Sequence, residues 1–221
     1  MKRWVVDKLI CPECNALEMP LELTIREERA DDVMDGELRC PDCDRRYPIR
    51  GGIAVILPEK TRHIMDSEEG YNSPSMVSSY LWSHFCDLFG DPQSTDADQV
   101  WSAPLRTSQG LALDVGCAVG RLSFELARTH ERVIGLDTSY AFVRQARQIL
   151  TRRRLGFDMI IEGRLTEPRE YTFGDDWDLG GVEFIVADAL ALPFRSHSFL
   201  TVAAINILEK VPAPLRHLLL L

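Results

Sequence analysis

The sequence lacks any long apolar segment. It has no run of about 18 apolar residues, so no segment is expected to span a membrane. A secretory signal is not expected, because Asp7 and Lys8 interrupt the apolar residues that come after Lys2 and Arg3. The chain also lacks an excess of basic residues: 34 acidic side chains outnumber 25 basic ones, and the net charge is −9. We therefore expect a cytoplasmic protein, and nucleic acid is an unfavoured partner because its binding proteins carry basic surfaces.

What is present is the composition of a globular protein. The chain has 221 residues, of which 45% are hydrophobic. At about 150 residues per domain, this length predicts either one domain or two unequal ones. Six cysteines without a secretory signal indicate reduced thiols or metal ligands rather than disulfides.

Four of the cysteines form two C-x-x-C pairs near the start of the chain. The pairs are Cys11-Pro-Glu-Cys14 and Cys40-Pro-Asp-Cys43. Two residues between thiolates allow a tight turn to aim both sulfurs at one point, and two such turns make the closed tetrahedral site that structural zinc prefers. The alternative of two disulfides is disfavoured. Because four thiolates leave no open coordination position, the predicted zinc stabilises a small module and is not catalytic.

The residues around these cysteines predict short strands. Residues 21–25 alternate like a strand, Asp35-Gly36 is a turn signal, and Ile53 to Leu57 is an apolar strand closed by Pro58. With the cysteine pairs, the ending Tyr47-Pro-Ile-Arg-Gly-Gly-Ile-Ala-Val-Ile-Leu-Pro58 resembles the small zinc-ribbon proteins that activate certain RNA and protein methyltransferases. The resemblance covers about residues 8–58, and Ala54 replaces the usual proline. It implies a module over residues 1–58 that docks in cis on the remainder of the chain, with a linker over residues 59–70.

The middle of the chain predicts one helix. Apolar residues fall at helical spacing between Ser75 and Phe89, and Gly90 with Pro92 ends the pattern. An acidic, turn-rich stretch occupies residues 94–99. Tyr71, Tyr80 and Trp82 are interpreted as core residues in preference to a roof over a ligand.

A strand-turn-helix-strand-helix pattern begins at Gly110. Buried strands are expected over residues 111–115 and 132–137, a helix over residues 121–129, and a second helix, capped by Thr138 or Ser139, that runs to about residue 150. This order makes a βαβα unit with parallel strands, and ligands bind at the carboxyl ends of such strands.

The turn after the first of these strands favours S-adenosylmethionine over a dinucleotide. The G-x-G-x-x-G register gives Gly116, Ala118 and Arg121, so the third glycine is absent. Asp114 would repel a pyrophosphate but can attract an ammonium group. Gly116 and Gly120 are expected to let the backbone approach the ligand without a Cβ. Asp137, at the end of the second strand, can accept hydrogen bonds from both ribose hydroxyls.

A third strand, residues 182–188, ends in Asp188-Ala189, and a fourth is expected over residues 200–206. Each of Asp114, Asp137 and Asp188 alone could be a helix cap or a surface turn. Three strand-terminal aspartates in sequence order make a cofactor site the stronger interpretation.

These motifs resemble the class I S-adenosylmethionine-dependent methyltransferases over residues 110–215. The matching segments are Leu-Asp-Val-Gly-Cys-Ala-Val-Gly, Val-Ile-Gly-Leu-Asp, Val-Ala-Asp-Ala-Leu-Ala-Leu-Pro-Phe and Asn-Ile-Leu-Glu-Lys-Val. The resemblance implies an α/β, Rossmann-like methyltransferase sheet in a domain over residues 71–221. It implies that Asp114, Gly116, Cys117, Ala118 and Gly120 contact the methionine and ribose side of the cofactor. It also implies that Asp137 holds the ribose, that Asp188 and Ala189 hold the adenine, and that Asn206 lies under the methionyl end. Thr138 is a further predicted cofactor contact. Two departures are Ala118 in place of a glycine and Leu200 in place of an aspartate.

The methyl acceptor is predicted to be a small molecule. Residues 155–181 exceed what a minimal fold needs, and a long segment of this kind is more often functional than idle. Together with residues 118–126 and 160–165 and the Asn-Ile-Leu-Glu-Lys-Val run, this segment resembles the methyltransferases that act on mercaptohistidine. The alternatives are an RNA or protein methyltransferase guided by the zinc ribbon, and a non-catalytic binding or scaffold protein. A general base is optional when the acceptor is a thiolate or an amine, so no catalytic residue is assigned; His84 and Glu209 are candidates for which surface roles are favoured.

Only four methyltransferase strands are predicted after Gly110, where the resemblance implies seven. We therefore expect a domain that is incomplete at its carboxyl end, with the fourth strand as an apolar edge that a second chain could cover.

Overall fold

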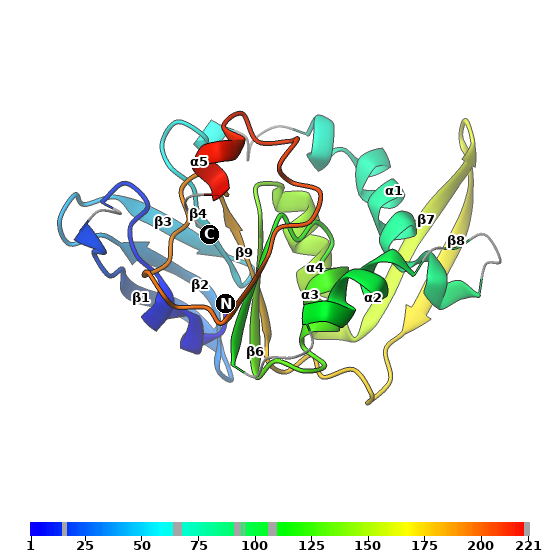
Figure 1. Ribbon diagram of the computed structural model, residues 1–221, viewed down its shortest axis with the longest axis horizontal. Coiled ribbons are helices and arrows are strands. Elements are labelled where there is room, and N and C mark those ends of the chain that lie inside the picture. The colour runs from blue at the N-terminus through cyan, green and yellow to red at the C-terminus, as the bar shows by residue number, and fades with distance from the viewer. Residues whose placement is uncertain (15–16, 64–67, 91–93, 95, 106–109, 219–221) are drawn as a thin grey trace.

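The main sheet of the molecule has eight strands. The computed structural model describes residues 1–14, 17–63, 68–90, 94, 96–105 and 110–218. The strand order is β1-β2-β3-β4-β9-β6-β5-β10 (Figure 1). These strands are β1 (Glu22–Arg29), β2 (Asp32–Arg39), β3 (Arg46–Arg50), β4 (Ile53–Ile56), β5 (Leu111–Val115), β6 (Arg132–Asp137), β9 (Val182–Ala187) and β10 (Thr201–Ala203). A separate two-stranded sheet is made of β7 (Arg154–Glu162) and β8 (Leu165–Thr172).

The helices of the described chain are short, apart from α1 and α4. The α-helices are α1 (Pro74–Phe85), α2 (Ala97–Ser102), α3 (Arg121–Leu126), α4 (Tyr140–Arg152) and α5 (Pro214–Leu218); the 3-10 helices are η1 (Arg3–Lys8), η4 (Gly70–Asn72), η5 (Cys86–Phe89) and η6 (Ala103–Leu105). In the described part of the chain, none of these helices is long and apolar enough to cross a bilayer.

The carboxyl-terminal half of the sheet is parallel. β10 pairs with β5, β5 with β6, and β6 with β9, all in the same direction. The carboxyl ends of these strands therefore meet at one edge of the sheet, where ligands bind in such folds. This arrangement confirms the predicted α/β, Rossmann-like fold. β10 forms the outer edge of the sheet, and the preceding Leu200 is 67% exposed.

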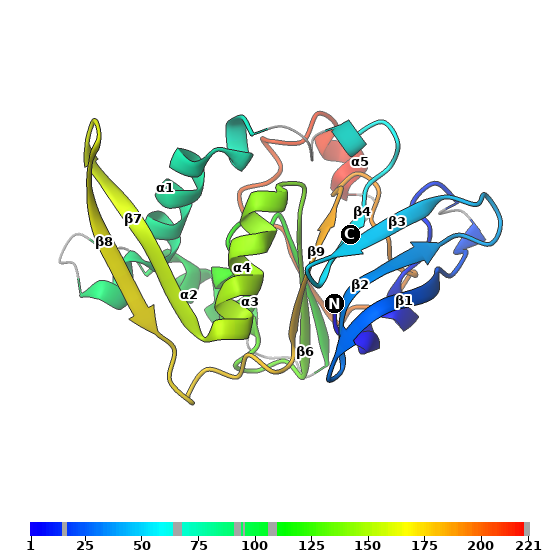
Figure 2. The same cartoon turned by 180° about the vertical axis from the view of Figure 1, so that it is seen from behind.

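The amino-terminal module continues the same sheet. Its strands β1 to β4 pair antiparallel to one another, and β4 then pairs in parallel with β9, with Val55 opposite Val186. Figure 2 shows the module extending the sheet beyond β9, on the side away from the β7–β8 hairpin. The module therefore docks in cis, as the resemblance to the zinc-ribbon proteins implied.

The two faces of the sheet are covered by different parts of the chain. Because side chains alternate along a strand, Val55 and Val186 face the core under α1, α3 and α4, whereas Ile56 and Ala187 face the other side. That second core is filled by the amino-terminal module; its buried residues there include Met1, Val5, Leu9, Leu38, Tyr47 and Ile49. The module therefore both lengthens the sheet and covers one of its faces.

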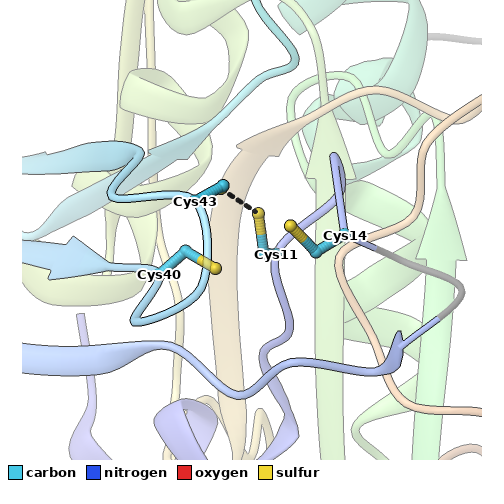
Figure 3. A group of neighbouring side chains, drawn as sticks. All are labelled: Cys11, Cys14, Cys40 and Cys43. Carbon is cyan, nitrogen blue, oxygen red and sulfur yellow. Dashed lines mark hydrogen bonds between the residues drawn. The ribbon is translucent and has the colours of Figure 1, made fainter.

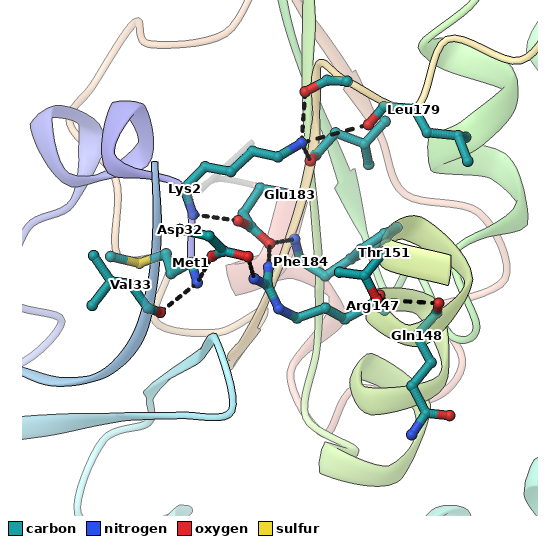
Figure 4. A network of polar contacts seen from close by, with 12 residues as sticks. Met1, Lys2, Asp32, Val33, Arg147, Gln148, Thr151, Leu179, Glu183 and Phe184 are labelled. Atoms are coloured by element: carbon teal, nitrogen blue, oxygen red, sulfur yellow. Dashed lines mark hydrogen bonds and ion pairs between the residues drawn. The ribbon is translucent and has the colours of Figure 1, made fainter. Parts of the chain in front are cut away.

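Charged groups lie at the seam between the module and the parallel strands (Figure 4). Arg147 of α4 pairs with Asp32 of β2 and with Glu183 of β9, and its side chain is 4% exposed. Asp32 also accepts a 2.6 Å hydrogen bond from the amino group of Met1. Gly52, with a φ of 80°, lies against Arg147: a Cβ at this position would collide with the guanidinium. Two anions and two cations thus satisfy one another where the layers join.

Three local expectations need correction. Asp35 and Gly36 lie inside β2, and not in a turn; a Cβ on Gly36 would come within 2.6 Å of the Thr24 carbonyl, next to an irregularity in the β1–β2 pairing. The expected fourth strand over residues 200–206 is only three residues long, because the chain leaves the sheet after Ala203. The acidic stretch over residues 94–99 contains the start of α2.

Two other segments differ in how well they were predicted. The predicted helix from Ser75 to Phe89 is present, with its last turn formed by η5. No secondary structure was predicted for residues 155–181, and this segment mostly forms the β7–β8 hairpin, which packs beside α1 (Figure 1).

Candidate active site

A cavity of about 650 Å³ lies at the carboxyl ends of β5, β6 and β9. Nine of the ten residues predicted to contact a cofactor line its wall: Asp114, Gly116, Cys117, Ala118, Asp137, Thr138, Asp188, Ala189 and Asn206. The parallel sheet explains why these positions converge although they are spread over more than 90 residues of sequence.

Gly120 does not line the cavity. It has a φ of 89°, and a Cβ added to it would lie 2.7 Å from the Phe184 ring and 2.9 Å from the Ala146 methyl. Glycine is therefore required here by the packing of α3 against β9 and α4. This differs from the expectation for Gly120.

The turn between β5 and α3 is held by the neighbouring strand. The backbone amides of Gly116 and Cys117 both donate 2.9 Å hydrogen bonds to the Leu136 carbonyl of β6. Asp114 precedes this turn, is 2% exposed, and accepts a 2.6 Å hydrogen bond from the Ser123 hydroxyl. Burial raises the pKa of Asp114 to about 7, although the Ser123 hydrogen bond opposes the shift. An incoming ammonium group would favour the ionised form of this carboxyl.

Asp137 ends β6 and shapes two turns. Its carboxylate accepts hydrogen bonds from the amide of Ala118 at 3.1 Å and from the amide of Ser139 at 2.8 Å. Burial raises the pKa of Asp137, and the backbone hydrogen bonds counteract part of that effect. Each carboxylate oxygen still has a lone pair for a further donor, so the residue can accept from ligand hydroxyls. Ser139 caps α4 by accepting from the Phe142 amide.

Asp188 and Ala189 come directly after β9, on the cavity wall. One oxygen of Asp188 accepts a 2.8 Å hydrogen bond from the Leu190 amide, which fixes the carboxylate at the end of the strand. Asn206 lies in the segment after β10 with a φ of 53°, and the neighbouring Ile207 packs on Gly116, where a Cβ would come within 2.9 Å.

The roof of the cavity contains residues that were not predicted to lie there. Tyr71 and Tyr80, expected in the core, line the cavity, as do Asp98 and Trp101 of α2; Trp82 does not. The candidates His84 and Glu209 also line it. The His84 side chain is only 24% exposed, in contrast to the surface role favoured for it, whereas Glu209 is exposed, as its favoured surface role requires. The spacing of Asp98 and Trp101, three residues apart on one helical turn, was the available signal, but α2 itself was not predicted.

The four cysteines of the two C-x-x-C pairs come together in the amino-terminal module. Their sulfur atoms lie within 4.8 Å of one another, and the Cys11 and Cys43 sulfurs are 3.7 Å apart (Figure 3). A tetrahedron of thiolates with Zn–S bonds of about 2.3 Å has sulfurs separated by about 3.8 Å, so this set fits a zinc ion. Cys11 and Cys40 are buried, and the Tyr47 hydroxyl lies 3.3 Å from the Cys11 sulfur.

Two family models match separate segments of the chain. Residues 113–219 match the family model described as a methyltransferase domain, and residues 6–52 match that of Trm112p-like proteins. No curated protein matches the sequence.

Several solved structures are similar to this chain. The MccD protein is 17% identical over 56% of this chain and 45% of its own, with a TM-score of 0.40. A TehB-like SAM-dependent methyltransferase from Corynebacterium glutamicum is 17% identical over 62% and 59%, with a TM-score of 0.39. Magnesium protoporphyrin IX methyltransferase from Synechocystis, solved with bound SAH, is 21% identical over 66% and 64%, with a TM-score of 0.37. The chain thus spans less than two thirds of the length of each of these proteins.

Proposed function

We propose that this chain, which joins a methyltransferase domain of the class I S-adenosylmethionine-dependent family to an N-terminal Trm112p-like zinc ribbon, transfers a methyl group from S-adenosylmethionine to a small-molecule acceptor. One observation carries the proposal: aspartates at the ends of three adjacent parallel strands, Asp114, Asp137 and Asp188, lie on the wall of a single cavity. Zinc is assigned to the four thiolates of the ribbon.

Each aspartate has a distinct task in this proposal. Bound S-adenosylmethionine supplies an electrophilic methyl group on a sulfonium centre. Asp114 pairs with the ammonium group, Asp137 accepts from the ribose hydroxyls, and Asp188 accepts from the adenine amino group, with Ala189 beside it. Gly116, Cys117, Ala118, Thr138 and Asn206 complete the wall. The protein then contributes alignment and exclusion of water, which are the main sources of catalysis in such a transfer.

The charge of the cavity supports a small acceptor over a nucleic acid. Beside the three aspartates assigned to the cofactor, the described lining carries the carboxyl groups of Asp98 and Glu209 and one ammonium group, that of Lys210. Such a wall repels phosphates and suits a neutral or cationic acceptor. The resemblance to methyltransferases that act on mercaptohistidine makes that compound the first acceptor to test. The Trm112p-like match supports the second candidate, an RNA or protein acceptor.

Calorimetry with S-adenosylmethionine tests the proposal. Wild-type protein should bind it, and Asp137→Ala should bind about 100-fold more weakly, because two charge-assisted hydrogen bonds at about 1.5 kcal/mol each are lost. Asp158→Ala, on the exposed face of β7, is the matched control and should bind like wild type. Absence of binding by folded wild-type protein would refute the enzyme and leave a scaffold. Methyl-transfer profiling against a metabolite extract and an RNA pool then separates the two classes of acceptor.

A further inference from the structure

One imidazole in the cavity roof is held on two sides. His84 of α1 lines the cavity, and its side chain is 24% exposed. Its Nδ1 lies 3.1 Å from Oδ2 of Asp98, a residue of α2 whose side chain is 9% exposed. The Tyr80 ring stacks on the imidazole, with ring centres 5.7 Å apart and planes inclined by 27°. Packing and a carboxylate thus fix the plane of this ring.

The backbone of His84 is tied to the start of α3, which follows the turn after Asp114 and β5. The Arg121 guanidinium, 1% exposed, donates a 3.2 Å hydrogen bond to the His84 carbonyl and pairs with both oxygens of Asp87, at 2.7 and 2.9 Å. Arg121 begins α3, directly after the β5 turn. The imidazole is therefore positioned with respect to the wall proposed to hold the cofactor, and not only within the roof.

This geometry selects one tautomer. An ionised carboxylate accepts hydrogen bonds and cannot donate them, so a neutral imidazole beside Asp98 carries its proton on Nδ1. The hydrogen bonds that the structure describes for this ring involve Nδ1 alone. Nε2 then keeps its lone pair available as a base.

We propose that His84 is the general base of this site and Asp98 its positioning residue, and that the acceptor carries a proton on its nucleophilic atom, as a thiol, a hydroxyl or an azole N–H does. In the transfer, the acceptor atom forms a bond to the methyl carbon and the carbon–sulfonium bond breaks, with its electron pair left on sulfur. The acceptor proton passes to Nε2 of His84. The inference rests on the proposed function for its methyl donor, but the tautomer can be measured without transfer.

Nitrogen NMR of histidine-labelled protein bound to S-adenosylhomocysteine tests the dyad directly. Neutral His84 should be the Nδ1–H tautomer in wild type, whereas Asp98→Asn should move it toward the Nε2–H form. An Nε2–H tautomer in wild type would overturn the proposal, because that nitrogen could not accept a proton. This measurement is informative whether or not an acceptor is known. The titratable groups around the ring are Asp98, Asp114 and Tyr80, with Glu209 and Lys210 lining the same cavity.

The second measurement uses S-adenosyl-[methyl-³H]methionine and a metabolite extract. His84→Gln should lower the labelling rate about 100-fold at pH 7. With a thiol acceptor, the variant should recover part of the rate toward pH 9, where the thiol ionises without a base; with a hydroxyl or azole acceptor, the rate should stay low. Asp98→Asn should lower the rate at least about tenfold. Both variants should bind S-adenosylhomocysteine as wild type does, and His197→Gln, at an exposed histidine, is the matched control.

The outcomes separate the two proposals. Equal rates for His84→Gln and wild type from pH 6 to 9 would overturn the role of His84. No labelling by wild type, or no binding of S-adenosylhomocysteine, would refute the proposed function, and the tautomer of the unliganded protein would still decide whether the dyad exists.

Discussion

Asp114 is a buried carboxyl group with a pKa raised to about 7 by its burial. If it pairs with an ammonium group, the ligand binds the ionised form, so the apparent affinity scales with the ionised fraction. That fraction falls from about nine tenths at pH 8 to about one tenth at pH 6 for a pKa near 7. We therefore expect the dissociation constant of S-adenosylhomocysteine to rise about tenfold as the pH falls from 8 to 6, measured by calorimetry.

Asn at this position is the control for the pH effect. Asp114→Asn keeps an oxygen near the Ser123 hydroxyl but cannot ionise, so it should bind more weakly at pH 8 and lose most of the pH dependence. A wild-type affinity that stays constant between pH 6 and 8 would contradict the assignment of Asp114 to the ammonium group.

At the scale of single residues, the sequence predicted which residues lie near the cavity better than it predicted the contacts that require each residue. The strand-terminal aspartates converge because parallel strands bring their carboxyl ends to one edge of the sheet, and the βαβα pattern of the sequence predicts parallel strands. Gly120 was expected near a ligand but serves packing against Phe184, a contact between segments 64 residues apart that no local pattern encodes. His84 and Asp98 lie on different helices, so their pairing also depends on tertiary contacts.

Zinc bound to the four cysteines should stabilise the amino-terminal strands together. Removing the metal leaves four thiolates within 4.8 Å of one another, and a module of this size has little core of its own without zinc. Treatment with a strong chelator should therefore lower the melting temperature and release one zinc per chain, as measured by metal analysis and circular dichroism. Cys14→Ser should lower the zinc content similarly.

Cys86 offers a matched control for that experiment. It is buried in η5, away from the cluster, and its sulfur lies near the Ser83 carbonyl. Cys86→Ala should keep the full zinc content. A wild-type protein whose melting temperature is unaffected by complete loss of zinc would show that the strands do not depend on the metal.

Secondary-structure elements were predictable where apolar residues form a continuous run or recur at helical spacing. The buried strands β5, β6 and β9 were found because they are short, continuous apolar runs. The β7–β8 hairpin was missed, since its strands are mostly exposed and carry charged residues. Asp35-Gly36 has the composition of a turn. In the structure Gly36 lies inside a strand, where the absence of a Cβ lets the Thr24 carbonyl approach closely. Composition alone does not distinguish these two uses of glycine.

At the scale of the whole molecule, the amino-terminal module is part of the same sheet as the parallel strands. Sequence motifs suggested a division at about residue 58, which we retain as a proposal for the domain boundary. In space, β4 pairs with β9, and the module supplies much of the core on one face of the sheet. Pairing of strands about 130 residues apart depends on the packed structure, so the sequence indicated docking only through resemblance.

The ion pairs shown in Figure 4 are expected to hold the amino-terminal module against the parallel strands, and a variant of Arg147 tests this. Arg147 is nearly buried and pairs with Asp32 and Glu183, so Arg147→Ala leaves two carboxylates without their main partner. Breaking a buried pair in this way costs about 3–5 kcal/mol. We expect a loss of that size in the free energy of unfolding in urea at pH 7. Arg144→Ala, at an exposed position of the same helix, should change it little.

The dependence of stability on pH shows whether the ionised form of Asp32 stabilises the fold. Burial alone would raise the pKa of Asp32, but the Met1 amino group and Arg147 lower it below the usual value of 3.8. A lowered pKa means that this carboxylate stabilises the fold above about pH 4 and that the contribution is lost as the pH falls further. Wild type should therefore lose more stability than Arg147→Ala between pH 5 and 2, because the variant lacks one of the two partners that keep Asp32 ionised. Equal acid sensitivity of the two proteins would show that Arg147 does not hold the seam.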